Sequence, residues 1–261
     1  MEKLTIHNLW CIIWVDFRPF QLEVTIMAKF AIKSVSEPTI SRVRPVNIMF
    51  DEDITTLEAE AVMNGLTKVM NAANAPQHMP INNFGVWRNS DWLEEGSLTQ
   101  WNSVDWYLAY TEHHHGRNGQ LRGGKLLQLL YSEPWQEAEA HYDIMVTSRD
   151  LYDDDCHFCI GLAIHGFGTV ISTARFRGLD QRTTVECVVT ETMHEAGHVF
   201  GLVPETRTSN VEHSLGLHCT NRCIMRQGLQ VPHWQTITAD RLAGHEFCEE
   251  CRHDLQRYFQ Q

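Results

Sequence analysis

The segment His194-Glu195-Ala196-Gly197-His198 constrains this chain of 261 residues more than any other feature. Positions four apart lie on one face of an α-helix, so a helix here would bring both imidazoles to one metal ion. Glu195 would project beside that ion, where a carboxylate can take a proton from a metal-activated water. Residues 184–193 contain neither Pro nor Gly, and Gly201 follows the second histidine by three residues. We therefore predict a mostly buried helix that ends near Gly201 and carries a catalytic zinc site.

Four of the eight cysteines form two close pairs near the C-terminus, Cys219 with Cys223 and Cys248 with Cys251. Two such pairs separated by a loop are typical of tetrahedral zinc sites with thiolate ligands. Two disulfides are the alternative, although cysteines as close as 248 and 251 form tight rings and pair poorly. We predict a structural zinc ion held by the four thiolates. His245 or His253, which flank the second pair, could replace one of them.

Charge and cysteine usage restrict the classes of partner and compartment. The chain has 21 basic and 33 acidic residues, a net charge of −12, and no run or stripe of Lys and Arg. This argues against nucleic acid or an anionic membrane surface as a partner. The apolar run 9–15 is too short to span a bilayer, and clustered cysteines favour metal chemistry in a reducing compartment. We expect a monomeric, cytoplasmic protein.

The hydrophobic pattern predicts a mixed α/β fold. Strands are expected over 46–50, 141–147, 158–163 and 169–173, and helices over 54–73, with Asp53 as N-cap, and over 125–131. Residues 74–120 have no clear pattern. This order predicts a sheet with helices packed against it. If the strand at 168–173 is a sheet edge that borders the cleft, an extended peptide could add to it as a further strand.

Several other polar groups have simpler interpretations than a second active site. His113, His114 and His115 are expected in a surface loop with adventitious metal affinity. Cys156 and Cys159 fall in or before a strand, where alternating directions would hinder shared coordination. The run Asp153-Asp154-Asp155 is expected to be a solvated loop, with calcium binding as a remote option.

From about His141 to Cys251 the chain resembles the archaemetzincins, a family within the metzincin clan of zinc peptidases. His194-Glu195-x-x-His198-x-x-Gly201 matches the opening motif of the clan. His218-Cys219 resembles the adjacent third histidine and first cysteine of the family. The remaining similarity lies in three segments before the helix, in the Met-turn and in the closing cysteine pair: 150–153, 158–163, 172–175, Cys223-Ile224-Met225 and Cys248-x-x-Cys251.

The resemblance implies a metzincin-like twisted mixed sheet with an active-site helix, within residues 45–202. It also implies a small zinc-stabilised subdomain over residues 203–261, while residues 1–44 remain as an N-terminal extension. Two zinc ions per chain are expected. The ligands would be three histidines for the catalytic ion (His194, His198, His218) and four cysteines for the structural ion (Cys219, Cys223, Cys248, Cys251). Met225 would form a hydrophobic floor beneath the catalytic metal.

One departure from the family pattern concerns the third histidine. The clan places it three residues after the glycine, where this chain has Pro204. Residues 203–217 therefore look like an insertion, and His213 inside it competes with His218 for the third position on the metal. We favour His218, because Cys219 beside it would be anchored by the second zinc ion.

The expected function is zinc-dependent hydrolysis of peptide bonds in a peptide or protein substrate, with Glu195 as general base. The rival interpretation is a catalytically silent, zinc-stabilised interaction module whose cleft is blocked by residues 203–217. Glu195 argues against this module, because a purely structural site needs no base. No organic cofactor is expected.

Overall fold

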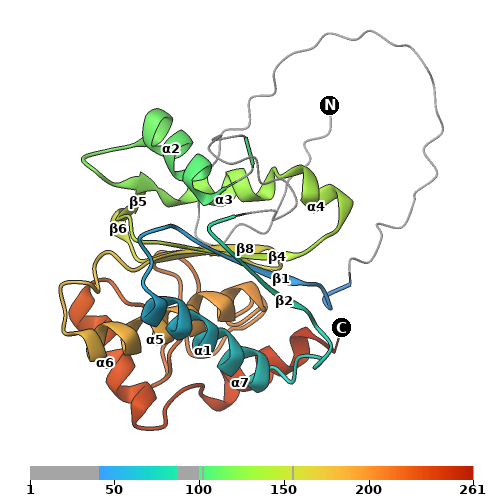
Figure 1. Ribbon diagram of the computed structural model, residues 1–261. Helices are drawn as coiled ribbons and strands as arrows, with labels where there is room; N and C mark the ends of the chain where they lie inside the picture. Colours follow the sequence, from blue (N-terminus) through green and yellow to red (C-terminus); the bar gives the residue numbers. More distant parts are fainter. Residues whose placement is uncertain (1–40, 88–99, 102, 155, 261) are drawn as a thin grey trace, which may run out of the picture.

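The computed structural model describes residues 41–87, 100–101, 103–154 and 156–260. Its centre is a sheet whose inner strands are buried on both faces. β1 (Val46–Phe50) and β4 (Tyr142–Thr147) are buried along their whole length. Because successive side chains of a strand point to opposite faces, Ile48 packs into one core and Met49 into the other. Helices cover both faces of the sheet (Figure 1).

Five strands form this sheet, in the order β2-β1-β4-β8-β7. β2 (Ile81–Gly85), β1, β4 and β8 (Gly168–Ser172) are parallel, and β7 (Gly161–Ile164) runs antiparallel to β8. Two smaller sheets join β3 (Leu121–Arg122), β5 (Leu151–Asp153) and β6 (Cys156–Cys159), and β9 (Val211–Glu212) with β10 (His218–Cys219). This mixed α/β architecture confirms the predicted fold class.

The helices divide into two layers (Figure 1). One face of the sheet carries α2 (Val104–His115), α3 (Gly123–Tyr131) and α4 (Pro134–Ala138). The opposite face carries α1 (Thr56–Ala72), α5 (Gln181–Val199), α6 (Val231–Leu242) and α7 (Glu249–Tyr258). α5 packs against α1 and α6, so the predicted motif helix lies in the middle of its layer.

The C-terminal residues share the larger core with α1 and α5. Trp234 and Ile237 of α6 and Leu255 and Tyr258 of α7 are buried in it. A division of the chain at residue 203 therefore stays a prediction. The proposed extension lies largely outside the described residues, as does the apolar run 9–15. Among the described helices, none has the length and apolar character needed to cross a membrane.

The strand at 168–173 is not a sheet edge, so the condition for docking a peptide along it is not met. β8 lies between β4 and β7, so both its sides are paired, and β7 forms the edge. The predicted strand at 158–163 is in fact two strands, β6 and β7, in different sheets. After β7 the chain reverses at Gly166, whose φ is +72°, and β7 then covers the open side of β8.

Three local predictions also need correction. Thr55, not Asp53, caps α1: its side chain accepts from the backbone of Glu58, whose carboxylate accepts from the backbone of Thr55, a capping box. The three histidines at 113–115 end α2 and are not in a loop. Asp153 is buried in β5 and accepts a 2.7 Å hydrogen bond from the backbone of Gly124, so the acidic run is only partly solvated.

Candidate metal centres and active site

α5 places the two motif histidines and Glu195 on its last two turns. The helix starts at Asp180, whose side chain accepts a 3.1 Å hydrogen bond from the backbone of Thr183. It ends before Gly201, whose φ is +79° and where a Cβ would lie 2.8 Å from the ring of Tyr258. Glycine is therefore needed both for the left-handed turn and for the close approach. The predicted helix and its end are confirmed.

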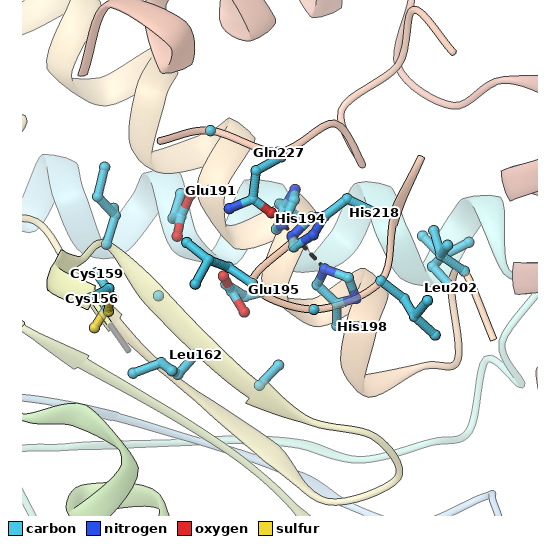
Figure 2. A pocket seen from close by; sticks show the side chains of 18 of the residues that line it. Cys156, Cys159, Leu162, Glu191, His194, Glu195, His198, Leu202, His218 and Gln227 are labelled. Carbon is cyan, nitrogen blue, oxygen red and sulfur yellow. Dashed lines mark hydrogen bonds between the residues drawn. The ribbon is translucent and has the colours of Figure 1, made fainter. Parts of the chain in front are cut away.

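Three histidines converge at the end of this helix: His194, His198 and His218, whose ligand atoms lie within 4.8 Å of one another. The Nε2 atoms of His194 and His198 are 3.2 Å apart, the dashed line in Figure 2. Zinc–nitrogen bonds of about 2.0–2.1 Å in a tetrahedron would separate two ligand nitrogens by about 3.3 Å. The spacing of these two atoms therefore fits a zinc ion.

The protonation of these histidines also suits a metal. Nδ1 of His194 donates to the carbonyl oxygen of Ile224 at 2.8 Å, which leaves the lone pair on Nε2 for a ligand. Burial lowers the pKa of His194 to about 4 and that of His218 to about 3. Burial, with the neighbouring imidazoles, lowers the pKa of His198 well below its usual value. All three rings are thus neutral near pH 7, the form that binds metal.

Residues 203–217, the segment predicted to be an insertion, lead to His218, which lies with the other two histidines, whereas His213 does not. A short hairpin of β9 and β10 pairs His218 with Glu212 and Cys219 with Val211. His218 is 6 % exposed, whereas His213 is exposed and is not part of the group of three. Pro204, the residue at the spacing where the clan pattern predicts the third histidine, lies on the wall of the adjacent cavity.

The four clustered cysteines form a second group: Cys219, Cys223, Cys248 and Cys251, with Sγ atoms within 4.8 Å of one another. Cys219 and Cys248 are 3.7 Å apart, and Cys223 and Cys251 are 3.8 Å apart. A disulfide requires about 2.05 Å. A tetrahedron of zinc–sulfur bonds of about 2.3 Å requires an edge of about 3.8 Å. The spacing fits a four-thiolate zinc centre, and His245 and His253 are exposed and outside it.

Backbone contacts hold the two centres next to each other. His218 and Cys219 are neighbours in β10, yet one belongs to the histidine group and the other to the cysteine group. The backbone of Cys219 donates to the carbonyl of Met225 at 2.8 Å. Met225 itself is fully buried, and Ile224 before it accepts the hydrogen bond from His194. The Met-turn segment therefore contacts both centres.

Glu195 lies beside the three histidines, together with a carboxyl that our sequence analysis missed. Glu191 is one helical turn earlier, and both carboxyls face Gly161 of β7, where a Cβ would lie 2.5 Å from Glu191 Oε1 and 2.6 Å from Glu195 Oε1. Burial raises the pKa of Glu195 to about 8. Burial and the charge of Glu195 raise the pKa of Glu191 well above its usual value. The four-residue spacing on a helix was a signal that could have identified Glu191.

The histidines and Glu195 face a cavity of about 620 Å³ (Figure 2). Its walls come from β6 and β7, from residues 201–206 and 215–218, and from 227–229 with Trp234. Residues 203–217 thus form a wall of this cavity and leave it open. Cys156 and Cys159 both line it. The register of β5 and β6 is irregular: Cys156 pairs with Asp153, and Cys159 pairs with Leu151. Because Asp153 and Leu151 are two residues apart in β5, the two cysteines lie on the same face, and the simple alternation that we expected does not hold.

Comparison with known proteins identifies the family. Residues 140–257 match Peptidase family M54. The archaemetzincin of Nanoarchaeum equitans is 32 % identical over 110 residues, 42 % of this chain and 49 % of that protein, so the chain spans about half of that relative. The archaemetzincin of Methanopyrus kandleri is 31 % identical over 142 residues, 53 % of this chain and 69 % of that protein.

The fold agrees with this match. The crystal structure of archaemetzincin from Methanopyrus kandleri superimposes with a TM-score of 0.57 at 22 % identity, and the superposition covers 84 % of this chain and 96 % of that one. The sequence match to the same protein covers more than two thirds of its length. The chain therefore belongs to the archaemetzincin family, peptidase family M54.

Proposed function

We propose that this chain is a zinc-dependent peptidase that hydrolyses peptide bonds in peptides or proteins. The observation that carries the proposal is the position of Glu195, a carboxyl beside three converging neutral histidines at an open cavity. A purely structural site has no use for a carboxyl that faces a cavity. An open cavity also argues against a silent interaction module whose cleft is blocked by residues 203–217.

The roles of the side chains follow from their positions. His194, His198 and His218 would hold the zinc ion, which when bound polarises the scissile carbonyl and acidifies the attacking water. Glu195 would accept the proton of that water as the new C–O bond forms, and would then pass it to the leaving nitrogen as the amide C–N bond breaks. The buried Ile224 carbonyl keeps His194 in the tautomer that this role requires.

β7 would hold the substrate. It is one of the two edge strands of the main sheet within the described part of the chain, and Gly161, Leu162 and Ala163 line the cavity next to Glu195. An extended peptide could pair with the open side of β7, with its backbone hydrogen bonds supplied by the strand. The four-cysteine centre would bind a second zinc ion with a structural role, because four thiolates leave no open position for a substrate.

A peptide library derived from whole-proteome digests tests the proposal. The parent chain is expected to cleave a subset of the peptides. Glu195→Gln removes the base and keeps the shape of the side chain, so cleavage should fall by at least about 100-fold while zinc content stays unchanged. If the parent, loaded with zinc, leaves the library intact, or if Glu195→Gln cleaves as well as the parent, the proposal is wrong.

A further inference from the structure

Arg207 lies in the inserted segment and is 5 % exposed. Its guanidinium has five N–H groups, and the contacts account for all of them. Nη1 lies 3.2 Å from Cys251 Sγ and 3.3 Å from Asp254, while Nη2 lies 3.2 Å from Cys219 Sγ and 2.8 Å from Glu250. Nε donates to the carbonyl of Ser209 at 3.0 Å. The side chain is therefore held in one orientation, with its fork directed at two of the four sulfurs.

The chemistry of these contacts depends on the ion that the cysteines bind. Zinc with four thiolates carries a net charge of about −2, and this charge lies in a buried region next to Glu250 and Asp254. A guanidinium that donates to two of the sulfurs offsets part of that charge with charge-assisted hydrogen bonds. Such outer contacts also fix the direction of ligand lone pairs and strengthen metal binding.

The same arginine also anchors the segment that forms a cavity wall. Ser209 and Asn210, just after it, donate to Glu250 of α7 at 2.6 Å and 2.9 Å. The segment then enters β9, returns through Leu215 and Leu217 on the cavity wall, and reaches His218 in β10. One short stretch of chain thus runs from the four-cysteine centre to the third histidine.

We propose that Arg207 is a positioning residue that ties the inserted segment to the metal-loaded four-cysteine centre and so holds His218 and the cavity wall in place. The inference rests on the two zinc sites of the proposed function. On this proposal, residues 203–217, which are the main departure from the family pattern, serve to connect the four-cysteine centre to His218. Loss of Arg207 should loosen the metal at the cysteines first, because that is where the fork makes its contacts.

The rate of metal loss from the four-cysteine centre tests this directly. Chains loaded with Co²⁺ absorb in the near ultraviolet through thiolate–cobalt charge transfer, to which a histidine site does not contribute, and EDTA removes the ion at a measurable rate. Arg207→Met should lose this absorption at least about tenfold faster than the parent. Arg207→Lys keeps the charge but not the fork, so its rate should lie between the two.

Arg241→Met is the matched control. The side chain of Arg241 is 4 % exposed, pairs with the Glu186 carboxylate, and also donates to the Thr190 hydroxyl and the Glu186 carbonyl, so its loss removes a buried ion pair without removing a bond to sulfur. Its cobalt loss should match the parent. Equal rates of cobalt loss in Arg207→Met and the parent, or an equal acceleration in Arg241→Met, would overturn the proposal.

If Arg207→Met fails to fold, Arg207→Lys decides the question, and a rate of cobalt loss equal to that of the parent contradicts the proposal. The readout requires no cleavage, so a chain without peptidase activity would refute the proposed function alone.

Discussion

At the scale of single residues, the candidate active site holds its ionisable groups in neutral forms when no metal is bound. Burial lowers the pKa of the three histidines and raises the pKa of Glu191 and Glu195. These shifts have opposite signs for acids and bases, yet each disfavours a charge. A divalent ion would reverse this preference for the carboxyl of Glu195, because a cation stabilises an ionised carboxylate, and it would keep the imidazoles neutral, because they bind it through their free lone pairs.

The first prediction is a fall in stability between about pH 6.5 and pH 8 when the histidine site is empty. The pKa of Glu195 rises to about 8 in the fold, above its value in the unfolded chain, so stability is lost as the pH rises toward 8. The histidines do not oppose this above pH 6.5, because they are then neutral in both states. Below pH 6.5 the three histidines take up protons in the unfolded chain but stay neutral in the fold, where their pKa values are lowered. Stability therefore also falls toward acid.

Thermal unfolding from pH 5 to pH 8.5 checks this prediction on protein that retains one metal per chain, after brief dialysis has emptied the histidine site. The melting temperature should fall on the alkaline side, and Glu195→Gln should flatten that fall. An alkaline fall of the same size in the parent and in Glu195→Gln would contradict the assignment to this carboxyl.

Sequence spacing predicted His194, Glu195 and His198, because four residues on a helix fix a shared face whatever surrounds them. The preference for His218 over His213 depended on the adjacent Cys219, and the structure brings His218 to the group. Arg207 gave no sequence signal, because its side-chain partners lie 12 to 47 residues away and come together only through the packing of α7 and β10.

At the scale of elements, pairing decides which strand borders the cavity, and sequence patterns do not encode pairing. β8 and β7 are both short and apolar, and only the reversal at Gly166 puts β7 outside. β2 could not be predicted from its sequence either, because its residues show no apolar alternation. β2 has the sequence Ile-Asn-Asn-Phe-Gly and is only partly buried, so it owes its strand to the neighbouring β1 rather than to an apolar pattern.

The second prediction concerns the close approach of β7 to the two carboxyls. Gly161→Ala would place a methyl group within 2.6 Å of carboxyl oxygens of Glu191 and Glu195. Either the strand or the base must move, at a cost of about 1–3 kcal/mol. Peptide cleavage should fall at least about tenfold, and the melting temperature should drop by a few degrees.

Gly178→Ala is the matched control, because an added Cβ there meets nothing within 4 Å and no positive φ is involved. This variant should keep the activity and melting temperature of the parent. Full activity in Gly161→Ala would show that the strand does not pack against the base as described.

At the scale of the whole molecule, both candidate metal centres lie on one side of the sheet and share a core. Three of the four cysteines are buried in the cluster that also holds α1 and α5, and Cys248 packs against it. The sequence indicated both ligand sets because their spacing is local. It could not indicate that the two centres share this core, since that depends on contacts of α5 with α1 and α6 and of α1 with the C-terminal helix α7.

The third prediction is that metal at the cysteines supports the fold. Cys223→Ser leaves an incomplete thiolate shell, and structural zinc contributes on the order of 10 kcal/mol to small zinc domains. The melting temperature should fall by at least about 10 °C or the chain should aggregate. Cys187→Ala, at a fully buried cysteine outside the four-cysteine group, should cost only a few degrees. Equal melting of Cys223→Ser and the parent would refute a structural role for this centre.

Metal content per chain tests the central claim most directly, namely that one chain binds two zinc ions at adjacent ligands of β10. Protein purified without added metal should contain about two zinc ions. His218→Ala should contain about one and lose cleavage, while His213→Ala should keep about two, because His213 is exposed and outside the group. About one zinc ion in the parent, or loss of zinc from His213→Ala but not from His218→Ala, would contradict the account.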